Sequence, residues 1–230
     1  MKNNFDWTFQ DAFEKTNPLF NWSREDRPAE FEKNTLLNNG KEILITSSGF
    51  VAENNTATFR YSRIQSAVLD IATVMIYPTV NSLKMPVFAC EWVLVQDKIH
   101  VIVLDIEWLQ QSDEAPLLYQ QLKADYEKWV AVFPPKKEWP AWFSEIASEV
   151  ALFSEAAVSQ MPLLQKSFNA YLNKWTAYCT LHTQEFLQGK DNEKVKEYKH
   201  HHYLNSPART IIKGDNEAWL NTFLKDYHFA

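Results

Sequence analysis

The chain has 230 residues, of which 46% are hydrophobic and 23% are charged, and its formal net charge is −6 at pH 7. A chain this long can bury most of its apolar surface without a disulfide or a structural metal, and the acidic balance argues against a nucleic-acid partner. It has four glycines and no GxGxxG string, which argues against a dinucleotide-binding loop.

The cellular compartment follows from the amino terminus and the cysteines. Met1 is followed by a polar, amphipathic stretch, and no window of about 18 apolar residues occurs, so we expect neither a signal peptide nor a membrane span. Cys90 and Cys179 are far apart in sequence and predict two buried thiols in a reducing cytoplasm. Two cysteines are too few for a typical structural zinc site, so we expect no bound metal.

The amino-terminal region predicts one short helix. Residues 6–15 (DWTFQDAFEK) are amphipathic. We expect the helix to end before Asn17-Pro18, because the residue before a proline avoids helical backbone angles.

Residues 41–108 predict a β-sheet. Residues 56–66 alternate, with Phe59, Tyr61 and Arg63 on one face and Arg60, Ser62 and Ile64 on the other. Only Gln96-Asp97 separates the last two runs, which indicates a tight hairpin. Strands joined by short turns cannot be parallel, so we expect a largely antiparallel sheet. The expected strands cover residues 42–47, 56–66, 69–77, 86–95 and 98–108.

After residue 115 the apolar residues follow a helical spacing. Residues 139–153 are aromatic and irregular, with room for one more strand. A sheet with helices on both sides predicts one three-layer α/β/α domain spanning residues 1–230. The expected helices cover residues 116–133, 162–187, 193–201 and 219–227.

Four segments resemble the ferredoxin-dependent bilin reductases. They are residues 59–78, which end in MIYP; 85–92 (MPVFACEW); 103–106 (VLDI); and a tail formed by 139–153 and 203–223 (YLNSPARTIIKGDNEAWLNTF). The resemblance implies an α/β/α sandwich that holds an open-chain tetrapyrrole such as biliverdin between the sheet and the C-terminal helices. It also implies that electrons arrive singly from a [2Fe–2S] ferredoxin, that no metal or flavin is bound, and that the protein is a monomer.

Glu91 is the leading candidate for a proton donor. Reduction of a bilin double bond takes two electrons and two protons, and a carboxylic acid kept neutral by desolvation is a suitable donor. Glu91 lies inside the apolar run PVFACEWVLV, where a charged carboxylate would be costly. It matches a catalytic aspartate of the family. The alternative is that Glu91 faces solvent on a half-exposed strand.

Two strand residues depart from one branch of the family. Thr73 stands where that branch has a histidine and others an asparagine, and Gln65 stands where it has a second acid. Neither residue can donate a proton at neutral pH, so both argue for a two-electron reduction and could instead contact the substrate. They could also be ordinary strand residues.

The tail contains the largest departure. Ser206 stands where the family commonly has an aspartate that donates a second proton. Asn205, Ser206 or an ordered water then replaces it, or one acid serves alone, or the protein carries a bilin without reducing it. His202, which is nearest the turn in a run of three histidines, is a further candidate because histidine titrates near neutrality; the run otherwise faces solvent.

Four residues are further candidates for substrate contacts. Arg209 matches a family arginine, and its planar fork suits a propionate, although it could equally form a surface ion pair. Arg60 and Arg63 are propionate candidates on opposite faces, of which at most one reaches the substrate. Asp105 matches an aspartate on the strand after the catalytic one and is either a substrate contact or a buried acid bonded to the backbone; Glu107 shares its face.

The lysines near the C-terminal helices could form a basic patch for an acidic ferredoxin, although such a run is usually a solvated helix face. They are Lys190, Lys194, Lys196, Lys199 and Lys213. Two rival functions remain open: a bilin carrier without activity, and a generic α/β binding domain whose resemblance to the family is accidental.

Overall fold

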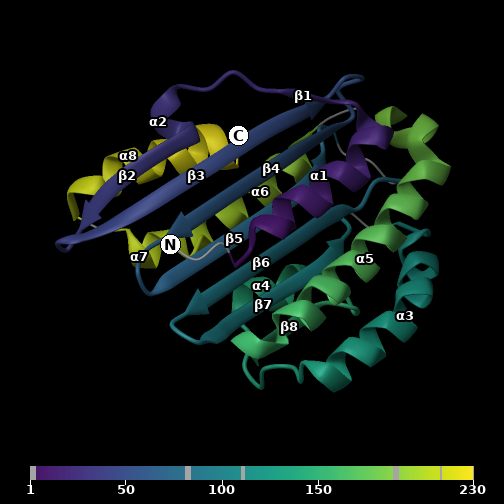
Figure 1. The fold of residues 1–230 in the computed structure, drawn as a ribbon. Helices are drawn as coiled ribbons and strands as arrows, with labels where there is room; N and C mark the ends of the chain where they lie inside the picture. Colours follow the sequence, from purple (N-terminus) through teal and green to yellow (C-terminus); the bar gives the residue numbers. More distant parts are fainter. Residues whose placement is uncertain (1–3, 81–83, 110–111, 189–191, 213, 230) are drawn as a thin grey trace.

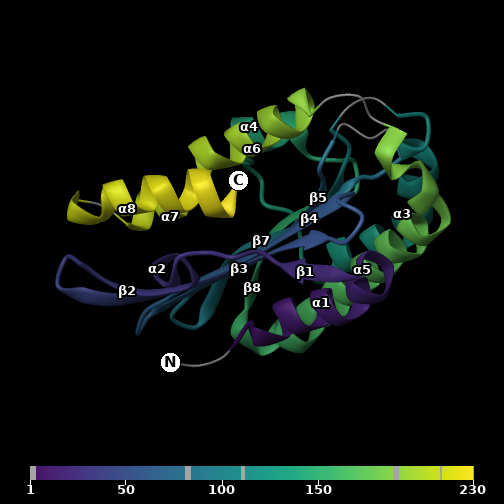
Figure 2. The same cartoon turned by 90° about the horizontal axis from the view of Figure 1, so that it is seen from above.

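A computed structural model describes residues 4–80, 84–109, 112–188, 192–212 and 214–229. It confirms the predicted three-layer α/β/α sandwich, with one eight-stranded sheet covered by helices on both faces (Figures 1 and 2). The strands are β1 (Trp22–Arg24), β2 (Lys33–Asn38), β3 (Lys41–Ala52), β4 (Ala57–Gln65), β5 (Leu69–Pro78), β6 (Val87–Val95), β7 (Lys98–Glu107) and β8 (Leu152–Ala157).

The α-helices and one π-helix lie before residue 33 and after residue 114, on either side of strands β2 to β7 in the sequence. They are α1 (Asp6–Phe20), α2 (Ala29–Glu32), α3 (Ala115–Val132), α4 (Ala141–Ile146), α5 (Met161–His182), α6 (Glu193–Asn205), α7 (Ala208–Ile211), α8 (Glu217–Thr222) and the π-helix η4 (Phe223–His228).

Every strand pairing is antiparallel, as the short turns predict. The strand order is β1-β3-β4-β5-β6-β7-β8. β2 and β1 share the free edge of β3, because β2 pairs with residues 41–46 and β1 with residues 50–52. The additional strand expected within residues 139–153 is found only at the end of that stretch: β8 begins at Leu152 and runs to Ala157, and the stretch itself contains α4.

Two tight turns depend on positive φ angles. Gln96 has a φ of 55° in the predicted hairpin between β6 and β7. Asn39 and Gly40, at φ 52° and 74°, connect β2 to β3, as expected for the Asn-Gly hairpin turn whose twist matches the flanking strands. The sequence reading did not predict β2, although this dipeptide signals it.

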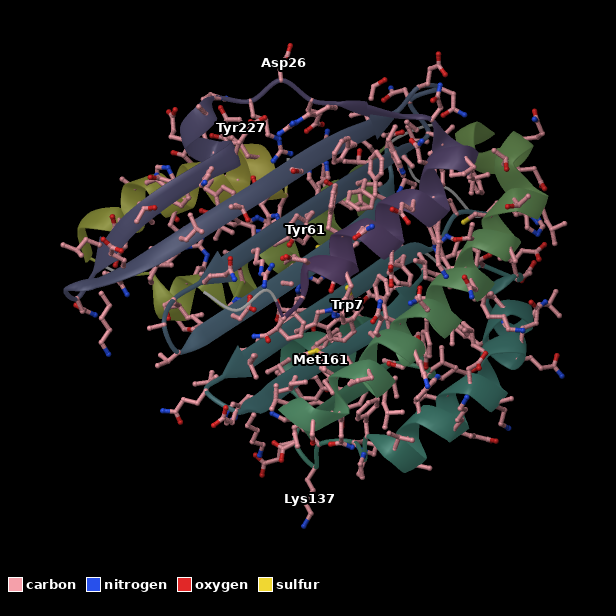
Figure 3. The ribbon with its side chains drawn as sticks, viewed as in Figure 1. Trp7, Asp26, Tyr61, Lys137, Met161 and Tyr227 are labelled. Atoms are coloured by element: carbon pink, nitrogen blue, oxygen red, sulfur yellow. The ribbon has the colours of Figure 1, made fainter. Side chains whose placement is uncertain are left out.

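The two faces of the sheet are covered differently. The face toward α1, α3 and α5, which we call the α1 face, buries large aromatic side chains such as Trp92, Phe88 and Trp175. Trp7 of α1 and Tyr61 of β4 lie on this side (Figure 3). The opposite face, which we call the α6 face, is covered by α4, α6, α7, α8 and η4 (Figure 2).

The expected end of the first helix at Asn17-Pro18 is wrong. α1 continues to Phe20 and contains Pro18. Proline in the last turn removes one hydrogen bond only, and the end is then fixed by side chains: Asn17 Oδ1 accepts from the Trp22 backbone N–H at 3.0 Å. Phe20 is 2% exposed and stacks on Trp22 with ring centroids 4.7 Å apart. This packing outweighs the local preference against helix.

Candidate active site

A cavity of about 220 Å³ lies on the α6 face. Its floor comes from strands β4 to β8, and its cover comes from α4, the α6–α7 connection and η4. The lining combines apolar side chains such as Ile71, Phe153 and Phe223 with a few polar groups. This composition is typical of a site for an organic ligand.

One row of side chains crosses the floor of the cavity. Ser62 on β4 pairs with Thr73 on β5, Thr73 pairs with Glu91 on β6, and Glu91 pairs with Val103 on β7. All four line the cavity. Because strand residues alternate between faces, the fully buried Trp92 beside Glu91 points to the α1 face, where its indole donates to Thr8 Oγ1 at 3.1 Å.

Glu91 has the environment expected of a neutral carboxylic acid. Burial raises its pKa to about 7, although a hydrogen bond from Thr73 acts in the opposite direction. The Thr73 hydroxyl donates to Glu91 Oε2 at 3.4 Å. The side chain is half-buried and opens into the cavity, so the solvent-facing alternative does not hold. Near neutral pH, Glu91 therefore presents a proton to whatever occupies the cavity.

Glu107 is a second carboxyl in the cavity lining, from the end of β7. It is 2% exposed. Burial raises its pKa well above the usual value, the neighbouring Asp105 adds to this, and the Tyr198 hydroxyl that faces it lowers it. We therefore expect Glu107 to be protonated at neutral pH.

Two histidines line the cavity from the cover. Burial lowers the pKa of both His202, on α6, and His228, on η4, to about 3, so both rings are neutral at pH 7. His202 lies against Tyr198, with ring centroids 4.4 Å apart. His228 Nε2 is 3.5 Å from the Ser62 hydroxyl. His202 thus lines the cavity as a neutral ring, not as the group titrating near neutrality that the sequence suggested, and His200 of the same run is exposed.

The turn after α6 also reaches the cavity. Asn205 is the last residue of α6, Ser206 follows it, and both line the cavity. The Asn205 amide donates to the His201 carbonyl at 2.8 Å, which holds this side chain against its own helix. Glu91, Thr73, His202, Asn205 and Ser206 are therefore brought together, as the sequence predicts.

Arg63 and Gln65 do not reach this cavity. They lie on the α1 face, and Arg63 forms a bidentate pair with Asp70, with Nε–Oδ1 and Nη2–Oδ2 both 2.8 Å. Arg63 also contacts Asp6 of α1. Gln65 is the cross-strand neighbour of Asp70. The structure thus corrects their predicted contact with a substrate at this site, because strand alternation turns them to the other face.

Asp105 and Arg209 do not line the cavity either. Asp105 is fully buried and accepts from the backbone N–H groups of Ile106 at 2.7 Å and Ser148 at 3.0 Å. It is the buried acid bonded to the backbone. Arg209 lies over the Tyr203 ring, 4.1 Å from its centroid, and donates to the Tyr203 carbonyl at 2.7 Å and to Asn221 at 3.0 Å. Its guanidinium therefore secures the α6–α7 turn.

Two of the described lysines have partners within the protein, and the basic patch that the sequence suggested stays a prediction. Lys194 pairs with Glu197 at 2.7 Å, whereas Lys199 is partly buried with its Nζ 5.0 Å from the centroid of the Tyr77 ring. Burial lowers the pKa of Lys199 to about 8. Lys190 and Lys213 lie outside the described residues.

His228 and Ser62 are cavity residues that the sequence reading missed. η4 is a π-helix, in which residues five apart are stacked, and the His228 ring lies 5.7 Å from Phe223 at an interplanar angle of 11°. No 3.6-residue pattern reveals such a pair. Ser62 could have been predicted as a candidate. Residues alternate along β4, so Ser62 lies on the same face as Arg60 and on the face opposite to Arg63.

The site as a whole is apolar, contains neutral histidines, and has two carboxyl groups whose pKa burial raises, Glu91 to about 7 and Glu107 well above its usual value. Such a site can hold a conjugated, mostly apolar molecule and protonate it from the sheet side. Every helix among the described residues is too short or too polar to span a bilayer. In that same part of the chain, no three His, Cys, Asp or Glu side chains are grouped as a metal site requires.

Comparisons with known proteins agree with this picture. The sequence profile described as ferredoxin-dependent bilin reductase matches residues 10–229. Among solved structures, the chain is similar to phytochromobilin synthase from tomato in complex with biliverdin, with 15% identity and a TM-score of 0.77. That match covers 98% of this chain and 82% of the other, and at this identity it supports the fold. No curated protein matches the sequence.

Proposed function

The chain belongs to the ferredoxin-dependent bilin reductase family, and from that premise we propose that it reduces an open-chain tetrapyrrole of the biliverdin type. The electrons come one at a time from a reduced [2Fe–2S] ferredoxin, and the pigment itself carries the unpaired electron. The protein then supplies orientation, exclusion of water and protons. It needs no flavin or metal of its own.

Glu91 carries this proposal. The reaction needs an acid that is neutral at the working pH and lies within reach of the pigment. Glu91 opens into the cavity, and burial raises its pKa to about 7. The position matches the family's catalytic aspartate in the segment MPVFACEW. A lone exposed glutamate, with a pKa near 4.3, would be almost fully ionised at pH 7 and could not act in this way.

The overall step is a two-electron reduction. Thr73 and Ser206, which both line the cavity, stand at positions where other family members have further proton-donating groups. With fewer such groups, one double bond is reduced and not two. The predicted cytoplasmic location and monomeric state are consistent with such a reductase and stay predictions.

A bilin carrier is the second candidate. The observation that favours it is Ser206, which lines the cavity where the family commonly has an aspartate. A carrier would hold the pigment in the same cavity and leave its double bonds intact.

Two spectral measurements test the proposal. Titration of the purified protein with biliverdin should shift and sharpen the visible absorption band of the pigment. Ferredoxin, ferredoxin reductase and NADPH are then added without oxygen. A reductase changes the band with time and yields a pigment two hydrogens heavier by mass spectrometry. A bound band that stays constant indicates the carrier, and no binding at all rejects both functions.

A further inference from the structure

Glu107 is a buried acid in the cavity to which the proposed function assigns no role. It lines the same cavity as Glu91 but from another strand. Its carboxyl is 2% exposed, and none of the ion pairs found in the described part of the chain includes it. A buried carboxyl without a cationic partner is stable only in its neutral form.

The strand register places Glu107 well away from Glu91. Glu91 pairs with Val103, and Glu107 lies four residues further along β7, opposite Val87. With about 3.4 Å per residue and about 4.8 Å between strands, the two Cα atoms are about 14 Å apart. Both side chains point to the α6 face, so the two acids lie under different parts of a ligand that covers the floor.

The surroundings of Glu107 keep a proton in place. Asp105, two residues away on the same face, disfavours a second negative charge. From α6, the Tyr198 hydroxyl faces the carboxyl, and His202, one helical turn later, is neutral because of its own burial. Tyr119 on α3 is the other titratable group that responds to the charge of Glu107. None of these neighbours is a cation that would withdraw the proton.

We propose that Glu107 is the second proton donor of the reduction. It replaces the aspartate that the family commonly has at the position of Ser206. This rests on the proposed function. Two reduced ferredoxins each give one electron and are oxidised, while Glu91 and Glu107 each give one proton. The π bond of the pigment breaks, each end of the reduced system gains hydrogen, and both carboxylates regain a proton from solvent.

The experiment compares Glu107→Gln with Glu91→Gln and with Glu145→Gln, an exposed control on α4. Each variant is loaded with biliverdin and reduced by ferredoxin without oxygen. We expect Glu107→Gln to bind biliverdin as the wild type does, to lose about 100-fold or more in rate, and to accumulate a one-electron-reduced pigment radical detectable by electron paramagnetic resonance. The control should behave like the wild type.

A second measurement does not depend on turnover. The infrared spectrum of the wild type at pH 7 should contain a protonated-carboxyl band that is absent from Glu107→Gln but remains in Glu91→Gln and in the Glu145→Gln control, which distinguishes it from the band of Glu91. If the wild type reduces biliverdin and Glu107→Gln does so at the same rate, or if that band persists in the variant, the assignment of Glu107 is wrong while the proposed function stands. If the wild type reduces no bilin, both proposals fail together.

Discussion

The two faces of the central sheet use the same strands for different purposes. On the α1 face, Trp92 and Trp175 are fully buried. Their indole N–H groups donate to Thr8 Oγ1 and to the Pro86 carbonyl, respectively. On the α6 face, Glu91, which follows Cys90 and precedes Trp92 in the sequence, and Glu107 lie in surroundings that disfavour a charged carboxylate. Burial therefore raises the pKa of both. The α1 face thus stabilises the fold through packing. The α6 face lowers the free energy of unfolding at neutral pH, because it buries carboxyl groups that are suited to donate protons.

This contrast predicts its largest effect on the α6 face. Glu91→Gln keeps the shape of the side chain but removes its proton. We expect biliverdin to bind as before and the rate of anaerobic reduction to fall by about 10²–10⁴-fold, the usual contribution of a general acid. Rapid-mixing absorption measurements check this. Turnover at the wild-type rate would remove Glu91 from the mechanism.

The corresponding change on the α1 face should alter stability and not chemistry. Trp175→Ala leaves a void beside Phe20 and Phe88 and should lower the free energy of unfolding by about 3–5 kcal/mol. Trp175→Phe is the matched control: it keeps one aromatic ring and loses the indole hydrogen bond to the Pro86 carbonyl together with a smaller part of the buried volume. Urea denaturation measures both. An alanine variant as stable as the phenylalanine variant would contradict the packing argument.

The acid at position 91 should also make stability depend on pH. Its folded-state pKa is about 7 against an ordinary value of 4.5, so the folded state binds this proton more tightly. Unfolding free energy is therefore lost as pH rises from about 4.5 to about 7. Relative to the wild type, Glu91→Gln should gain up to about 3 kcal/mol between pH 4 and pH 8, at 1.36 kcal/mol per pKa unit.

Urea titrations of wild type and Glu91→Gln at several pH values measure this difference. Glu107 titrates in both proteins and cancels. A difference that is constant with pH would show that Glu91 is ionised in the folded protein, in conflict with its assigned role.

The smallest effect is expected at Thr73. Its hydroxyl donates to Glu91 Oε2 at 3.4 Å and lowers the pKa of that carboxyl. Thr73→Val removes the donor at nearly constant volume, so Glu91 should keep its proton to a higher pH. A hydrogen bond of about 0.5–1.5 kcal/mol corresponds to about half to one pH unit. The alkaline limb of the pH–rate profile should move upward by that amount, and a downward shift would contradict the assignment.

The sequence predicted most of the fold, because the relevant signals are local. Alternating strands, the Gln96-Asp97 hairpin and the change to helical spacing after residue 115 each involve neighbouring residues. The first helix was misjudged because packing at a distance decides its end: Phe20 contacts Trp175 of α5, and α1 continues past Pro18. β2 was missed for another reason, because its signal, the Asn39-Gly40 turn, is local and was present in the sequence.

The site was predicted less completely. Which residues of different strands lie side by side depends on the pairing register, and the register cannot be read from one strand alone. Glu91 and Thr73 were found through the resemblance, and strand pairing then places Ser62 beside them. Gln65 shares a face with Tyr61, and only the folded structure shows that this face packs against Phe9 of α1. His228 could not be found from spacing, because the π-helix that carries it breaks the ordinary helical period.

The alternation of Glu91 and Trp92 limits how the gene can change length. Inserting or deleting one codon inside β4–β7 would exchange the roles of the two surfaces, placing an indole in the reaction chamber and an acid in the hydrophobic packing. The pairing irregularities that the sheet tolerates fall at Val93/Leu94 and between Ile99 and Ile102, beyond the row that contains Glu91. Natural length variation should therefore be confined to turns such as residues 53–56, 66–68 and 96–97.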